Sequence, residues 1–208
     1  SGKTTIASLL LELYEIDNGD IKIDGQSISK VSSQTLRNHI SYVPQDGFLF
    51  SDTILHNIEF GSKNLHENDN DIEERVIDVT KMSDVYDDIM DFRENFDTLL
   101  GERGITLSGG QKQRVSISRA VVSDPNVIIF DDSFSAIDTT TESQILQNLL
   151  DIRSISTMVI IGHRVSTVKN ADNIVVIDSG RVIEAGSHDE LINYGGYYAE
   201  LYEKQQNK

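Results

Sequence analysis

Residues 127–132 read Val-Ile-Ile-Phe-Asp-Asp, and this stretch decides the fold class. Four consecutive apolar residues are typical of a β-strand that is buried on both faces, as the strands of parallel sheets are. The two carboxylates that follow are expected at the carboxyl edge of the sheet, where open α/β folds bind their ligands. A surface turn is the alternative, but it suits so apolar a run poorly. We therefore predict a buried strand that presents Asp131 and Asp132 at a functional site.

Strands and helices alternate around this stretch. Apolar runs predict strands at 21–23, 40–43 and 157–161, the last also buried, and a hairpin at 173–184 around Ser179-Gly180. Apolar spacing predicts helices at 4–14, at 141–150, and from His188 and Tyr197 onward, and a helix with the stripe Ile72, Val76 and Val79. Residues 51–120 are polar and helical in pattern. The sequence therefore predicts an α/β fold with core segments 1–50 and 121–208 and a helical subdomain inserted at 51–120.

Composition excludes several classes of function. The 208 residues include 18 basic and 34 acidic side chains, and the net charge of −16 opposes binding to nucleic-acid phosphates. The chain has no cysteine, which excludes disulfide frameworks and thiolate zinc sites. No apolar run approaches the ~20 residues that cross a bilayer, and the first residues do not resemble a signal peptide. We expect a soluble, cytoplasmic chain that serves a membrane only through a partner or a further part of the polypeptide.

The first five residues, Ser-Gly-Lys-Thr-Thr, match the end of a phosphate-binding loop of pattern G-x-x-x-x-G-K-[ST]. Only its last three signature positions, Gly2, Lys3 and Thr4, are present. In such a loop Lys3 would reach the β- and γ-phosphates, and the Thr4 hydroxyl would ligate Mg²⁺ at the start of a helix. The tripeptide also recurs by chance, so it indicates a nucleotide site only with other support.

A second helix opens with Leu-Ser-Gly-Gly-Gln at 107–111. Two glycines at a helix start cost about 1 kcal/mol each relative to alanine. An anion held by exposed N–H groups would offset that cost, and the plain alternative is a helix capped by Ser108 after a loose turn. Acidic residues at 87, 88 and 91 are interpreted as a solvated helix face.

The strand ends supply further polar groups. Asp131 would hold Mg²⁺, and Asp132 would orient or deprotonate a water molecule. His163 follows the next strand at an equivalent edge, although a lone histidine is more often structural.

Together, these motifs resemble the nucleotide-binding domain of ATP-binding-cassette (ABC) proteins. They are, in order, Gly2-Lys3-Thr4, Gln45 after a strand, the 107–111 signature, the strand with Asp131 and Asp132, and His163. Residues 135–138 resemble the family's D-loop, and residues 180–191 resemble its C-terminal hallmark. The resemblance covers essentially the whole chain and implies a P-loop NTPase core with a mainly parallel sheet flanked by helices.

The resemblance extends to a subtype. Tyr-Val-Pro-Gln-Asp at 42–46 and Gly-Glu-Arg-Gly at 101–104 look like exporter-type cassettes. Such cassettes commonly follow a membrane domain in one polypeptide, and this chain begins inside the phosphate loop, so we expect it to be the back of such a protein. Half of the phosphate cradle is then missing, and we expect these 208 residues alone to bind nucleotide weakly.

The resemblance also implies roles for individual residues. It assigns contacts with one ATP to Ser1, Gly2, Lys3, Thr4, Thr5, Gln45, Asp131 and His163, with Mg²⁺ held by Thr4, Gln45 and Asp131. It assigns contacts with the γ-phosphate of a partner's ATP to Ser108, Gly109, Gly110 and Gln111. Gln45, Asp132 and His163 would act in hydrolysis. The implied partners are a second cassette, identical or different, paired head to tail, and transmembrane domains on the cytoplasmic side of the cell membrane; no nucleic acid is implied.

Two residues depart from the family's pattern. Asp132 stands where a presumed catalytic Glu is usual, and a side chain one methylene shorter would misplace the water by about 1 Å, a shift that can cost on the order of 10²-fold in rate. Similar cassettes occur in heterodimeric exporters in which one ATP site hydrolyses poorly. Leu99 stands where exporter cassettes often carry a Glu near the transmembrane contact.

Two other functions stay open at this point. A soluble ABC ATPase of chromosome maintenance would need a long coiled coil between the phosphate loop and the signature, and one of translation would need a basic surface. A non-hydrolysing, ATP-binding regulator is suggested by Asp132 alone.

Overall fold

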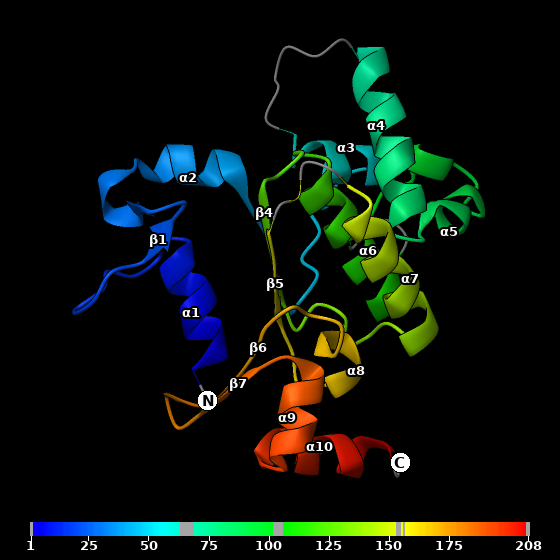
Figure 1. Ribbon diagram of the computed structural model, residues 1–208. Coiled ribbons are helices and arrows are strands. Elements are labelled where there is room, and N and C mark those ends of the chain that lie inside the picture. Colours follow the sequence, from blue (N-terminus) through cyan, green and yellow to red (C-terminus); the bar gives the residue numbers. More distant parts are fainter. Residues whose placement is uncertain (1, 63–68, 102–105, 153–154, 156, 207–208) are drawn as a thin grey trace. The chain divides into compact units, whose positions relative to one another are not determined.

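The computed structural model describes residues 2–62, 69–101, 106–152, 155 and 157–206. The chain divides into two compact units, Ser1–Val31 with Ile160–Lys208 (the terminal unit) and Ser32–Val159 (the central unit). Figure 1 traces both along the chain. Among the described helices, none is both long enough and apolar enough to cross a membrane.

The predicted buried strand is β4 (Val127–Asp131) of the central unit. Its neighbours are β3 (Ile40–Val43) and β5 (Thr157–Ile161), in the order β3-β4-β5. Strands β3 and β4 pair in parallel, with Ile40 opposite Val127. Residues 128–130 are fully buried, which confirms the interpretation of this stretch. The prediction for β5 was wrong in one respect: it forms a strand, but Thr157 is exposed and residues 158–161 are only half-buried.

Helix α6 (Gly109–Val121) contacts α3, α4 and β3 of the central unit. The other helices are α2 (Ser33–His39), α3 (Ile54–Glu59), α4 (Asp69–Met82), α5 (Tyr86–Met90), α7 (Thr139–Leu150) and the 3₁₀ turn η2 (Asn95–Asp97). In Figure 1, α3 to α7 gather beside β4. On α4, Val76 and Val79 are buried and Ile72 is half-buried, as the predicted stripe requires. The boundary of the inserted subdomain at 51–120 stays a prediction.

Helices α3 and α6 approach so closely that a side chain could not fit between them at one point. A Cβ atom added at Gly61, just after α3, would lie 1.8 Å from the backbone oxygen of Arg119 on α6. The glycine is therefore a packing requirement of the helical part of the central unit.

The terminal unit contains short elements from both ends of the chain. These are α1 (Lys3–Leu10), β1 (Lys22–Ile23), β2 (Gln26–Ser27), the 3₁₀ turn η1 (Ile28–Lys30), α8 (Val165–Val168), β6 (Ile174–Asp178), β7 (Arg181–Gly186), α9 (His188–Tyr194) and α10 (Tyr197–Gln206). The predicted hairpin is confirmed, since β6 and β7 pair antiparallel around Ser179-Gly180. Helix α1 ends four residues before the predicted Tyr14, because the chain turns to a left-handed conformation at Glu12, with φ of 52°.

The C-terminal hallmark has a structural role inside the terminal unit. The Glu184 carboxylate accepts hydrogen bonds from the backbone N–H groups of Tyr197 and Tyr198, at 2.5 and 3.0 Å, and so caps α10. Ser187 and Glu190 form a capping box at the start of α9. The His188 Nδ1 atom lies 2.8 Å from the Tyr198 hydroxyl oxygen, in hydrogen-bond contact. These contacts tie β7, α9 and α10 together.

Candidate functional site

The end of β4 places a buried carboxylate where the sequence predicts a site. Asp131 is only 3% exposed, and its Oδ2 accepts a hydrogen bond from the Tyr42 hydroxyl on β3 at 3.1 Å. Burial, together with the Asp131 charge and hydrogen bond, raises the pKa of Tyr42 to about 12. The phenol therefore stays a proton donor toward this carboxylate at neutral pH.

The chain leaves the strand at Asp132, whose φ of 50° lies in the left-handed region. This conformation is uncommon for a residue other than glycine and costs of order 1 kcal/mol, and such strained residues cluster at functional sites. Asp132 itself is half-buried. The carboxylates at 131 and 132 thus differ in surroundings although they are adjacent in sequence.

The signature turn, which we define as residues 108–111, forms a capping box at the start of α6. The Ser108 hydroxyl accepts from the Gln111 backbone N–H at 3.2 Å, and the Gln111 Oε1 accepts from the Ser108 N–H at 3.0 Å. The expectation of a helix capped by Ser108 is therefore confirmed. The Lys112 N–H is bonded as well, to the Ser108 carbonyl.

Two backbone N–H donors at the N-terminus of α6 take no part in these hydrogen bonds. Within the described part of the chain, the N–H groups of Gly109 and Gly110 make no hydrogen bond. Gly109 is exposed and Gly110 half-buried. Two adjacent donors at a helix start suit an anion, so the capped helix and the anion site are compatible with each other.

Packing gives a further reason for glycine in the signature turn. A Cβ atom added at Gly110 would lie 3.0 Å from the Ala136 carbonyl oxygen, and one added at Gly109 would lie 3.4 Å from the Ala136 Cβ. The start of α6 therefore rests directly on the segment that follows β4. The contact cannot be predicted from the sequence, because Ala136 lies far from the two glycines along the chain.

Gln113, which the sequence analysis did not single out, joins three segments of the site. Its side chain is only 5% exposed. The Nε2 donates to the Gln45 carbonyl at 3.0 Å and to the Ser135 hydroxyl at 3.4 Å, and the Oε1 accepts from the Ala136 N–H at 3.0 Å. A signal was present, because Gln113 is a polar residue on the helical face that continues at the buried Ile117.

Gln45 follows β3, and its own side chain is exposed. The loop after it touches the backbone of α6, since a Cβ atom added at Gly47 would lie 2.9 Å from the Lys112 carbonyl oxygen. Together with the Gln113 bond, this contact fixes the backbone of the loop and leaves the Gln45 amide accessible.

The loop continues to an exposed group of three rings in edge-on and tilted contact, which we call the aromatic patch: Phe48, Phe50 and Phe60. Phe48 and Phe60 are 64% and 69% exposed, and the Phe50 ring contacts both. Arg119 on α6 holds this loop from within, donating to the Phe48 carbonyl at 2.8 Å and to the side chain of Asn57 at 2.6 Å. Burial lowers the pKa of Arg119. These hydrogen bonds hold the backbone of the loop in place while its phenylalanine rings stay exposed on the surface.

The remaining site residues belong to the terminal unit. Lys3 begins α1, and no side chain caps the helix at Gly2, whose φ is 93°. Thr4 and Thr5 are exposed, and Ser1 lies outside the described residues. His163 follows β5 with an exposed side chain, and its carbonyl accepts from the Gln205 Nε2 on α10 at 2.8 Å.

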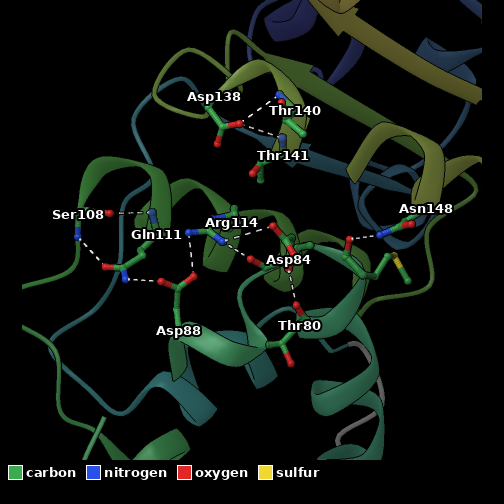
Figure 2. Close-up of polar contacts among 12 residues, drawn as sticks. Thr80, Asp84, Asp88, Ser108, Gln111, Arg114, Asp138, Thr140, Thr141 and Asn148 are labelled. Atoms are coloured by element: carbon green, nitrogen blue, oxygen red, sulfur yellow. Dashed lines mark hydrogen bonds and ion pairs between the residues drawn. The ribbon is translucent and has the colours of Figure 1, made fainter. Parts of the chain in front are cut away.

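The structure places Gln45, the signature turn, Asp131 and Asp132 in the central unit, while Gly2 to Thr5 and His163 lie in the terminal unit. One expectation needs correction. Asp88 is not part of a purely solvated face, because it bonds both Gln111 and Arg114 (Figure 2).

Comparisons with known proteins identify the family of the chain. The family model for the ABC transporter domain matches residues 1–135. ATP-binding cassette sub-family B member 6 of Xenopus tropicalis is 44% identical over 207 residues, which is 100% of this chain and 24% of that protein. ABC transporter B family member 24, mitochondrial, of Arabidopsis thaliana is 40% identical, across 100% of this chain and 30% of that protein.

A solved structure is similar to nearly the whole chain. It is that of a bacterial Atm1-family ABC exporter with ATP bound, with a TM-score of 0.90 and 42% identity, and the match covers 98% of this chain and 35% of the exporter chain. The chain thus spans about a quarter to a third of the length of these relatives. The chain belongs to the ABC transporter family, as a nucleotide-binding domain of the exporter type.

Proposed function

We propose that this domain binds ATP together with a second cassette and hydrolyses it to drive export by the full protein. The observation that carries the proposal is the signature turn, whose Gly109 and Gly110 N–H groups make no hydrogen bond among the described residues. Two such donors at a helix start match the charge of a terminal phosphate. Each relative named above is an ABC transporter, which supports the same conclusion.

Phosphate binding in the chain's own site falls to the first residues. Lys3 supplies a cation for the β- and γ-phosphates, and Gly2 lets the backbone approach them. The N-terminus of α1, which no side chain caps, adds the positive end of its helix dipole. Ser1 and Thr5 complete the same loop in sequence.

The donor set suits Mg²⁺. The Thr4 hydroxyl, the Gln45 amide oxygen and the Asp131 carboxylate are all hard oxygen ligands, which magnesium prefers. Asp131 is a buried carboxylate held by a protonated Tyr42, so its position is fixed before any ion arrives. When bound, the ion neutralises charge on the β- and γ-phosphates.

Hydrolysis requires that a water molecule be held in line with the γ-phosphate. Asp132 takes this role in our proposal, with His163 as a further contact to the phosphate and Gln45 positioned next to the water by its loop. Because Asp132 is one methylene shorter than the usual Glu, we propose that the chain's own site turns over slowly. Its intact signature turn would complete a faster site on a different partner cassette.

The second cassette is proposed to pair head to tail, so that Ser108 and the two glycines of one chain meet the ATP held by the other. Closure around ATP, followed by separation after hydrolysis, then shifts the population between open and closed dimers. In the full transporter, this shift between open and closed dimers drives export.

Contact with the transmembrane domains is assigned to the aromatic patch. Three exposed rings in edge-on and tilted contact are the kind of apolar surface that marks a protein interface. Leu99 is also exposed. Its backbone forms an isolated antiparallel β-bridge with Thr53, which follows the same loop, and we count its side chain as part of this apolar surface. We propose that this surface lies against the cytoplasmic ends of the membrane helices, which places the domain at the cytoplasmic face of a membrane.

The function is tested on the full-length protein in lipid vesicles by Mg²⁺-dependent release of phosphate from ATP. Lys3→Ala should abolish release, because the charge that meets the β- and γ-phosphates is lost. Lys30→Ala, an exposed lysine of η1, is the matched control and should leave release unchanged. Equal rates in the two variants would contradict the proposed function.

A further inference from the structure

The geometry points to Asp88 as a positioning residue that sets the orientation of the signature turn through the Gln111 amide. This inference rests on the proposed function for its catalytic consequence. The structural part of it, the hold on residues 108–111, stands by itself.

The Gln111 side chain is fully engaged within the chain. Its Oε1 accepts from the Ser108 N–H at 3.0 Å, and its Nε2 donates to the Asp88 Oδ1 at 2.8 Å (Figure 2). An amide bonded to a donor on its oxygen and to a carboxylate on its nitrogen has only one favourable orientation. Asp88 therefore decides that the oxygen, and not the nitrogen, faces Ser108.

Asp88 is itself held in place by Arg114, one turn further along α6. The Arg114 Nη2 lies 2.9 Å from the Asp88 Oδ2, and its Nη1 donates to the Asp84 carbonyl before α5. The Arg114 side chain is only 15% exposed and the Asp88 side chain 31%, so solvent screens the pair less than a surface ion pair. The two oxygens of one carboxylate thus bind two residues of α6.

The consequence lies at the Gly109 and Gly110 N–H groups. Because the capping box occupies the N–H groups of Ser108 and Gln111, these two are the donors of the signature turn that no described residue accepts from, and they can meet an anion. If the Gln111 amide turns, the Ser108 N–H loses its acceptor, and the N–H groups of Gly109 and Gly110 no longer point in a fixed direction. Charge stabilisation by such donors depends on their being positioned before the reaction.

Helix α5, which carries Asp88, also supplies a matched control residue. Asp87 carries the same charge on α5 but is exposed, and none of its side-chain contacts is among the hydrogen bonds or ion pairs of the described residues. Replacing Asp87 or Asp88 by alanine makes the same change in net charge, in helix dipole and in helix propensity. Any difference between the two variants therefore reports the contacts of Asp88 alone.

The test uses the full-length transporter in lipid vesicles with four variants: Asp88→Ala, Asp87→Ala, Gln111→Ala and the double variant Asp88→Ala/Gln111→Ala. Loss of a charge-assisted hydrogen bond predicts a fall in kcat of at least about tenfold for Asp88→Ala and none for Asp87→Ala. Binding of trinitrophenyl-ATP without Mg²⁺ should stay unchanged, because the phosphate loop is untouched. The double variant should be no slower than Gln111→Ala, since both changes remove the same contact.

Amide hydrogen exchange separates this inference from the proposed function. Exchange at residues 108–111 should quicken in Asp88→Ala and stay at the wild-type rate in Asp87→Ala, whether or not the protein hydrolyses ATP. Equal exchange in the two variants would overturn the positioning role. So would a double variant whose loss in kcat is the product of the two single losses, or a weakening of trinitrophenyl-ATP binding equal to the loss in kcat. An inactive wild type with the expected exchange pattern would instead count against the proposed function alone.

Discussion

Two adjacent carboxylates at the end of β4 have different surroundings, which suit them to different roles. Asp131 is buried and bonded by Tyr42, whereas Asp132 is half-buried and sits in a left-handed turn. The first is suited to hold a cation in a fixed position, and the second to meet a water molecule. The sequence predicts both roles from the strand pattern, but it does not show the tyrosine contact, which joins two strands far apart in the chain.

Lengthening the side chain at position 132 tests whether the short Asp132 side chain misplaces the water molecule. Asp132→Glu should raise the rate of ATP hydrolysis by the full transporter, because the longer side chain brings the carboxylate about 1 Å closer to the water. At this site the increase should reach on the order of 10²-fold. Steady-state phosphate release measures the change, with Asp124→Glu as a control on an exposed aspartate that also has positive φ. An unchanged rate would refute the geometric argument.

The phenol of Tyr42 should make stability depend on alkaline pH. Its pKa is raised from 10.0 to about 12 in the folded state, so the folded protein binds this proton more tightly than the unfolded chain does. That contribution is fully present below pH 10.0 and is lost as the pH rises toward about 12. Tyr42→Phe has no phenol to titrate, so the wild type should lose more stability than this variant between those values. Parallel losses, measured by thermal unfolding at each pH, would contradict the assignment.

Helix α6 links several segments of the central unit through its packing and its polar side chains. Its start forms the signature turn, Gln113 bonds the Gln45 loop and the segment after β4, and Arg119 holds the loop of the aromatic patch. Periodicity predicts that the helix exists and which face is apolar. It does not predict these polar contacts, because each partner lies many residues away and depends on how the chain folds back.

Replacing Gln113 tests whether these segments are coupled. Gln113→Leu removes the hydrogen bonds to the Ala136 N–H and to the Gln45 carbonyl, at a cost of about 0.5 to 1.5 kcal/mol for each bond. Hydrogen exchange should therefore quicken at residues 133–136 of the full-length protein, and ATP hydrolysis should slow. Gln144→Leu, an exposed glutamine on α7, is the control and should change neither. Protection at 133–136 equal to that of the control would mean that the Gln113 bonds do not hold this segment.

Helix and strand ends show where local sequence is sufficient. The bounds of β3 and β5 match the prediction, because short apolar runs end at Pro44 and Gly162. Helix α1 was predicted too long, since its apolar spacing continues past the residue where the backbone turns. Spacing alone carries no information on a left-handed residue such as Glu12.

At the scale of the whole molecule, the site residues are divided between two units of one chain. The phosphate loop and His163 lie in the terminal unit, and the signature turn with Asp131 lies in the central unit. The order of these motifs along the chain predicts the family, which the comparisons confirm. Their order does not predict how a domain with a net charge of −16 meets a second cassette. In our proposal, two adjacent donors of the signature turn make that contact through the other cassette's ATP.

Cross-linking between cassettes tests this claim most directly, and these 208 residues contribute no cysteine of their own. In the assembled transporter, a short thiol-specific reagent should join Ser108→Cys to a cysteine placed in the phosphate loop of the other cassette. The account predicts that ATP increases this cross-link, while Ser143→Cys on the exposed surface of α7 gives none. A yield from Ser108→Cys that ATP does not change, or one that Ser143→Cys equals, would contradict it.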